Sequence, residues 1–288
     1  MKMKRLLSLL FVFAVFIAGC APAATPTAVL TQPPATEALS LAPTAIPSTV
    51  TPESRTLTVF AAASLTSAFT EIGKNFEVAN PGVTVTFNFA GSQALRTQIE
   101  EGAPADVFAS ANKTEMENLI TSTFVAQDAS QIFLNNKLVV ILPADNPAAL
   151  EQLEDLAKPG IKLVLAAEEV PVGKYARQSL DAMNGQFGSD FKDKVLANVV
   201  SNEDNVKQVV AKVQLGEVDA GIVYTSDAVA APELKPIEIP AELNVVAKYP
   251  IAPLMKSTNT DLATAFIEYV LSPDGQAVLQ KWGFAPAR

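Results

Sequence analysis

The fold is decided by residues 57–92, which read LTVFAAASLTSAFTEIGKNFEVANPGVTVTFNFAGS. The first six residues are largely apolar, as in a buried strand, and Pro81-Gly82 is a typical turn before the alternating run Val83–Phe89. Between them, apolar residues recur at spacings of four, three and four, the pattern of one helix face: Leu65, Phe69, Ile72 and Phe76. The stretch therefore predicts a strand, a helix and a second strand.

Strands and helices continue to alternate along the rest of the chain. Apolar runs predict further strands at residues 105–109, 138–142, 163–166, 220–223 and 245–254. Helical spacing and capping residues predict helices at residues 95–102, from Asn112 onward, and at 150–156, 206–213, 262–271 and 273–282. This alternation predicts an α/β fold with largely parallel sheets that are covered by helices.

The first twenty residues have the pattern of a secretory signal. Three basic residues precede the apolar run 6–18, which is shorter than the about 20 residues that a membrane-spanning helix needs. The sequence IAGC at 17–20 resembles the bacterial lipobox, which implies that residues 1–19 are removed and that Cys20 carries lipids. A buried N-terminal helix that ends in an incidental cysteine is the alternative.

A stretch rich in Ala, Pro and Thr follows and extends the lipidated segment to residues 20–55. Because proline removes backbone donors and favours extended conformations, we expect a semi-extended tether that spaces the globular part from the membrane. The protein is therefore expected to be extracytoplasmic and lipid-anchored to the cell membrane.

Composition excludes several kinds of function. The chain has no histidine, which removes the commonest general base and the commonest transition-metal ligand. Cys20 is the single cysteine, so the mature protein forms no internal disulfide. The formal net charge of −9 becomes more negative when the basic leader is removed, which argues against nucleic acid as a partner because phosphate contacts depend on Lys and Arg.

Two serines occupy equivalent places in the predicted pattern. Ser64 and Ser92 each follow a strand and immediately precede a helix. Such a serine is a natural N-cap, whose hydroxyl serves the free N–H groups of its own helix. The alternative is an anion site, because helix N-termini at the carboxyl ends of parallel strands present free N–H groups and a positive dipole end. Position alone leaves both interpretations open.

A longer set of motifs is similar to one known family. In order and with compatible spacing, the chain resembles the molybdate-binding proteins of ABC transporters at Val59–Leu65, Phe89–Ser92, Gln98–Phe108, Val170–Ala176, Glu203–Val206, Gly221–Ala228, Tyr249-Pro250 and Trp282–Phe284. The resemblance runs from residue 57 to about residue 285. It implies a two-lobe periplasmic-binding-protein fold of type II, with lobe I at 56–136 plus 250–288, lobe II at 137–249, and the ligand cleft between them.

The resemblance also implies how the ligand is held. Hydroxyl and N–H groups of Ser64 and Ser92, N–H groups of Val172 and Val206, and the phenol of Tyr224 would donate to molybdate or tungstate. The metal is bound as its oxyanion, with no direct cation ligand and no cofactor. The implied partner is the membrane permease of an ABC importer, and the implied state is a monomer without enzymatic activity.

Two departures from the family pattern concern the pocket. Gly91 stands where serine is frequent, and Val172 stands where alanine is common; neither removes a donor, but the bulk of Val172 could tighten the pocket.

Other functions stay open at this point. The near alternative is a binding protein for sulfate, phosphate or another tetrahedral oxyanion. A serine hydrolase would have to use Lys74 or Lys174 as its base, and it lacks the Gly-x-Ser-x-Gly elbow. A metal site would find only carboxylates, and the pair Glu203-Asp204 is more typical of a solvated helix start. A ligand-sensing domain of a regulator is opposed by the signal sequence and by the lack of a DNA-binding segment.

Overall fold

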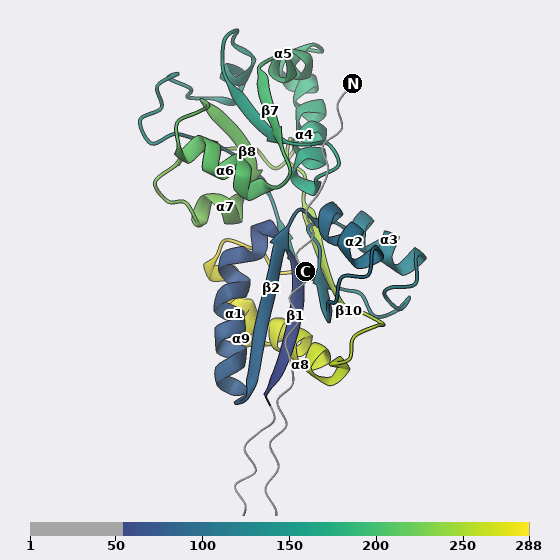
Figure 1. Ribbon diagram of the computed structural model, residues 1–288. Helices are drawn as coiled ribbons and strands as arrows, with labels where there is room; N and C mark the ends of the chain where they lie inside the picture. The colour runs from purple at the N-terminus through teal and green to yellow at the C-terminus, as the bar shows by residue number, and fades with distance from the viewer. Residues whose placement is uncertain (1–53, 288) are drawn as a thin grey trace, which may run out of the picture. The chain divides into compact units, whose positions relative to one another are not determined.

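The computed structural model describes residues 54–287, which belong to one compact unit that spans Val50–Arg288. The predicted signal peptide, Cys20 and nearly all of the predicted tether lie outside the described residues. The unit contains two five-stranded sheets with helices packed against them (Figure 1).

The first sheet has the strand order β2-β1-β3-β10-β4. β1 pairs in parallel with β2 and β3, whereas β10 runs antiparallel to both β3 and β4. Four of its strands therefore point in one direction and β10 in the other. The strands are β1 (Arg55–Ala62), β2 (Val83–Ala90), β3 (Val107–Ala109), β4 (Gln131–Asn136) and β10 (Ala247–Pro253).

Helices cover both faces of this sheet, and the burial of β1 shows why its second half, residues 59–62, is continuously apolar. Val59 and Phe60 are adjacent, yet each packs into a different hydrophobic cluster, one on each face. A parallel strand that is buried on both faces cannot alternate apolar with polar residues. The helices on one face are α1 (Thr66–Ala79), α8 (Thr260–Leu271) and α9 (Pro273–Lys281), and those on the other are α2 (Ser92–Glu100) and α3 (Lys113–Thr121).

The second sheet repeats the arrangement with the order β7-β6-β8-β5-β9. β6 is parallel to β7 and β8, and β5 is antiparallel to β8 and β9. The strands are β5 (Leu138–Leu142), β6 (Leu163–Ala166), β7 (Val199–Glu203), β8 (Ala220–Tyr224) and β9 (Lys235–Glu238). The helices are α4 (Pro171–Phe187), α5 (Phe191–Ala197), α6 (Val206–Gln214) and α7 (Thr225–Val229).

The predicted α/β class with two sheet-and-helix halves is confirmed, and each sheet is mixed, with one strand against the direction of the other four. Lys137 alone separates β4 from β5, so the chain passes from the first sheet to the second at this residue. It is back in the first sheet at β10, where Ala247 and Tyr249 pair with β4. Sheet membership therefore changes back before residue 247.

Some elements differ from the sequence-based expectation. The helix predicted at 150–156 is a short 3-10 helix, η2 (Leu153–Ala157). The strands at 131–136, 199–203 and 235–238, together with α4, α5 and α7, were not predicted. β4, β7 and β9 are three of the four edge strands and carry polar residues, which breaks the apolar run that marks a central strand. The fourth edge strand, β2, keeps a clear alternation and was predicted.

Candidate anion-binding site

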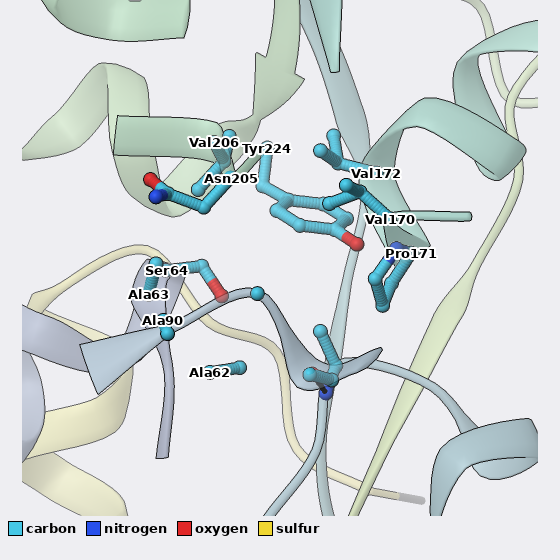
Figure 2. Close-up of a pocket in the computed structure, with 13 residues that line it drawn as sticks. Ala62, Ala63, Ser64, Ala90, Val170, Pro171, Val172, Asn205, Val206 and Tyr224 are labelled. Carbon is cyan, nitrogen blue, oxygen red and sulfur yellow. Dashed lines mark hydrogen bonds between the residues drawn. The ribbon is translucent and has the colours of Figure 1, made fainter. Parts of the chain in front are cut away.

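A small cavity lies where loops from the two sheets meet, and all five residues implied by the resemblance line it. Its volume is about 10 Å³, close to the smallest space that holds one water molecule. Figure 2 shows the lining residues, with Ser64 coming from the short helix after β1 of the first sheet and Tyr224 from the end of β8 in the second. The thirteen residues are Ala62, Ala63, Ser64, Ala90, Gly91, Ser92, Ala111, Val170, Pro171, Val172, Asn205, Val206 and Tyr224.

The lining has no charged side chain. Its polar groups are hydroxyls, one carboxamide and backbone amides, and the rest of its surface is Ala, Val, Pro and Gly. Lys74 and Lys174, the bases that a hydrolase would need, are exposed on α1 and α4 and do not line the cavity. The cavity therefore offers hydrogen-bond donors in apolar surroundings rather than a nucleophile with its base.

The two serines do not cap their own helices. Ser64 lies in the 3-10 helix η1 (Ala63–Leu65), and its Oγ is 2.9 Å from the hydroxyl oxygen of Tyr249. Ser92 is the first residue of α2, and its Oγ accepts a hydrogen bond of 3.0 Å from the amide of Ala111. The N-cap interpretation of both serines is therefore wrong, and both buried hydroxyls keep their hydrogen-bonding capacity for the cavity.

Three helices begin at the cavity: α2, α4 and α6. The amides of a helix's first turn have no intrahelical acceptor, and the aligned peptide dipoles place about half a positive charge at that end. In α4, Pro171 occupies the first position and has no N–H, so the first amide of that helix is that of Val172. These ends supply positive potential without an ionised side chain.

At the start of α6, some backbone amides are bound by the N-cap side chain and one amide is left free. The side chain of Asn205 accepts from the amides of Lys207 at 3.0 Å and Gln208 at 3.2 Å, which is ordinary N-capping. The cap does not use the amide of Val206, which is the first residue of the helix and lines the cavity. An asparagine before a helical run is the sequence signal of this cap, but it gives no sign of a ligand site.

Tyr224 carries the most informative atom of the cavity. It ends β8, only 1% of its surface is exposed, and its hydroxyl has no hydrogen-bond partner among the described residues. Burial raises the pKa of this phenol well above its ordinary value, and the neighbouring phenol of Tyr249, which forms no hydrogen bond of ordinary geometry with it, adds to the rise. The hydroxyl therefore keeps its proton. A buried hydroxyl without a partner costs about 1–3 kcal/mol, and a polar ligand in the cavity would relieve that cost.

Two acidic side chains near the site form ion pairs with lysines, and none of these residues lines the cavity. Asp227 on α7 is fully buried, and one of its carboxylate oxygens lies 2.8 Å from the ammonium of Lys207. Burial raises the pKa of Asp227, and the ion pair with Lys207 opposes that rise. Glu203, which the sequence placed at a helix start, instead ends β7 and pairs with Lys212 at 2.7 Å. Within the described part of the chain, no group of three or more acidic or cysteine side chains could hold a metal ion.

The two sides of the cavity also touch directly. The side-chain amide of Gln93, on α2, donates to the backbone carbonyl of Asp204 at 3.2 Å. This bond joins the helix after β2 to the loop after β7. The backbone of Gly91 also lies close to the carbonyl of Asp204, since a Cβ at residue 91 would be 2.6 Å from its oxygen. Glycine at this position therefore allows the two sides to come together.

Two helix-covered sheets, joined by two crossings and sharing a neutral cavity of donors, define a two-lobe binding protein for a small ligand. The family profile of bacterial extracellular solute-binding proteins matches residues 57–285. The chain belongs to this family, and it is a binding protein rather than an enzyme. Within residues 54–287, no helix combines the length and apolar character needed to cross a membrane.

Similar proteins carry consistent descriptions. The molybdate-binding protein ModA of Mycobacterium tuberculosis is 38% identical over 85% of this chain and 90% of its own length. The putative ABC transporter substrate-binding lipoprotein YvgL of Bacillus subtilis is 32% identical over 80% of this chain and 86% of its own length. The structure of the substrate-binding domain of a putative molybdenum ABC transporter from Clostridium difficile has a TM-score of 0.62 and 33% identity, over 82% of this chain and all of that domain.

Proposed function

We propose that this protein captures molybdate or tungstate outside the cytoplasm and delivers the oxyanion to the membrane permease of an ABC importer. The observation that carries the proposal is the neutral cavity, in which the unpartnered hydroxyl of Tyr224 faces a set of free amides and serine hydroxyls. The similarity to molybdate-binding proteins over most of the chain supports the choice of ligand.

The proposed site consists of seven uncharged donors. They are the N–H and O–H groups of Ser64 and Ser92, the amides of Val172 and Val206, and the phenol of Tyr224. Hydrogen bonds to a charged partner contribute about 1.5–3 kcal/mol each, so the gross sum is on the order of 10–20 kcal/mol. Association costs about 4–15 kcal/mol, and the difference is compatible with affinities from micromolar to nanomolar.

A cavity built of donors selects a fully deprotonated anion. Hydrogen phosphate would bring an O–H group that finds no charged acceptor in the lining, and an unmet buried donor costs about 1–3 kcal/mol. Sulfate satisfies the same donors as molybdate, so the distinction between these two depends on the size of the cavity. At about 10 Å³ the cavity has no room for a sugar or a peptide, and even a four-oxygen anion requires its walls to separate slightly.

The proposal extends to the segment that precedes the described residues. The lipobox-like sequence before Cys20 and the Ala/Pro/Thr-rich tether support a lipoprotein anchored at the outer face of the cell membrane. One similar protein is itself described as a substrate-binding lipoprotein. We expect a monomer, since one chain supplies all the donors that line the cavity.

Calorimetric competition tests the ligand directly. Purified protein is titrated with molybdate and tungstate, and each titration is repeated in the presence of excess sulfate or phosphate. We expect tight one-to-one binding of molybdate and tungstate that excess sulfate or phosphate does not prevent. Tight sulfate binding with no molybdate uptake would move the assignment to a sulfate-binding protein of the same fold, and binding of none of the four anions would overturn it.

A further inference from the structure

The hydroxyl of Ser64 is supported from behind by a buried polar chain. The hydroxyl oxygen of Tyr249 lies 2.9 Å from the Oγ of Ser64, and the side-chain nitrogen of Asn136 lies 3.4 Å from the same phenol oxygen. The nitrogen of Asn136 also donates to the Oγ of Ser226 at 2.9 Å. The chain connects η1, β10, β4 and α7, so it joins both halves of the molecule at the crossing between the sheets.

The direction of this chain follows from the donors that it contains. The side-chain oxygen of Asn136 accepts from the amide of Lys137 at 3.0 Å, which settles that the opposite end of the carboxamide is the NH₂ group. An NH₂ group only donates, so the phenol oxygen of Tyr249 is the acceptor in that contact. The contact between the hydroxyls of Tyr249 and Ser64 allows either one to donate. With Asn136 donating to the phenol oxygen, Tyr249 can give its own proton to the Oγ of Ser64, and this is the direction that the proposal assigns.

The other serine of the cavity is arranged in the same way. A backbone amide can only donate, so the Oγ of Ser92 is the acceptor of its bond from Ala111. For Ser92 a backbone donor therefore occupies the acceptor side of the hydroxyl, and its proton is left for the cavity. With Tyr249 as the donor, the same holds for Ser64. The two hydroxyls are therefore set as donors by different means, one by the main chain and one by a phenol.

The phenol of Tyr249 is well placed for this task. Its side chain is fully buried, and its ring makes edge-on contacts with three aromatic rings, those of Phe133, Tyr224 and Phe284, at centroid distances of 6.5, 5.8 and 6.0 Å. Such packing fixes the ring, so the hydroxyl cannot turn away from Ser64 without a change in the core. Tyr249 does not itself line the cavity.

We propose that Tyr249 is a positioning residue that holds the Ser64 hydroxyl as a donor toward the bound oxyanion. This inference rests on the proposed function. It adds a residue outside the cavity lining that influences how tightly the oxyanion binds and favours its deprotonated form. Without the phenol, the hydroxyl of Ser64 is free to rotate and to act as donor or acceptor, so its bond to the oxyanion loses its fixed direction.

A double-mutant cycle tests the proposal by calorimetry with molybdate. Tyr249→Phe keeps the ring and removes the hydroxyl, and we expect it to weaken molybdate binding about tenfold, as when one charge-assisted hydrogen bond loses part of its strength. In a Ser64→Ala background the same substitution is expected to change the affinity by less than about twofold, because the group that it positions is gone. An equal loss in both backgrounds would overturn the proposal, since it would show an effect that does not act through Ser64.

Matched controls keep the result interpretable. Tyr269→Phe removes a phenol hydroxyl on α8, away from the cavity lining, and is expected to bind molybdate like the unmodified protein. If the unmodified protein binds no molybdate, the proposed function fails; if it binds and Tyr249→Phe binds equally well, only the positioning role fails.

Should Tyr249→Phe not fold, Asn136→Asp takes its place in the cycle, because a carboxylate would accept the proton of Tyr249 and reverse the direction of the hydrogen bonds. That variant is expected to lose affinity in a Ser64-dependent manner, and a loss independent of Ser64 would contradict the proposal.

Discussion

The unpartnered hydroxyl of Tyr224 leads to opposite expectations for the free and the bound protein. Tyr224→Phe removes a buried polar group that has no partner among the described residues, so the ligand-free protein is expected to keep or gain stability. In the complex the same substitution deletes a hydrogen bond to a charged partner, worth about 1.5–3 kcal/mol, which corresponds to a roughly 10- to 150-fold weaker affinity for molybdate. The two effects have different signs and can be measured on one preparation.

Thermal unfolding with and without molybdate, together with calorimetry, provides the assay. For a unit of this size a change of about 1 kcal/mol moves the Tm by roughly 2–4 °C, so the molybdate-induced rise in Tm should shrink by about 3–12 °C in the variant. Tyr269→Phe, with its phenol outside the cavity, serves as the control. A lower Tm of the ligand-free variant combined with an unchanged affinity for molybdate would refute the reasoning, because it would mean that the hydroxyl supports the fold and not the ligand.

Further predictions concern the contact across the cavity and the pH dependence of binding. Gly91→Ala places a Cβ 2.6 Å from the carbonyl oxygen of Asp204, so we expect the walls to be held apart and molybdate binding to weaken at least tenfold in calorimetry; an unchanged affinity would show that the backbone yields. Gln93→Ala deletes the bond to that carbonyl, and stopped-flow measurements should find molybdate dissociation several-fold faster with a nearly unchanged association rate; a slower association alone would argue against this role. The pKa of Tyr224 is raised by burial, so this donor stays protonated as the pH rises to its ordinary pKa of about 10, and affinity should be flat between about pH 7 and 9; a decline in that interval would mean that another group of the site titrates.

Much of the fold was accessible from the sequence because its central strands and amphipathic helices follow simple periodicities. β5 and the second half of β1 are continuous apolar runs, as strand segments buried on both faces must be, and α1 shows a clear helical face. The edge strands β4, β7 and β9 escaped prediction because polar residues interrupt their pattern, whereas the edge strand β2 alternates clearly and was predicted. The residue at which the chain returns to the first sheet has no sequence signal, because β10 is extended on both sides of residue 250 and only its pairing with β4 shows which sheet it joins.

The candidate site, like the fold, could be predicted from the sequence only in part. The resemblance named Ser64, Ser92 and Tyr224 together with the two valines, and the structure brings all five to one cavity; their role as oxyanion donors stays a prediction. Residue types alone could not have identified Val172 and Val206, because an amide donor leaves no mark on its side chain. Residues such as Tyr249 and Asn136 could not be assigned either, since a supporting hydrogen bond between segments more than a hundred residues apart has no local sequence signal.

The excess of acidic over basic residues, set against a cavity without charge, has a consequence for how quickly the ligand arrives. A dianion that approaches a protein of net charge −9 is repelled at long range, and no cationic side chain in the lining attracts it at short range. Added salt shortens the Debye length to about 8 Å at physiological strength and so hides the repulsion. Capture should accordingly speed up as ionic strength rises, the reverse of what proteins with basic anion sites do.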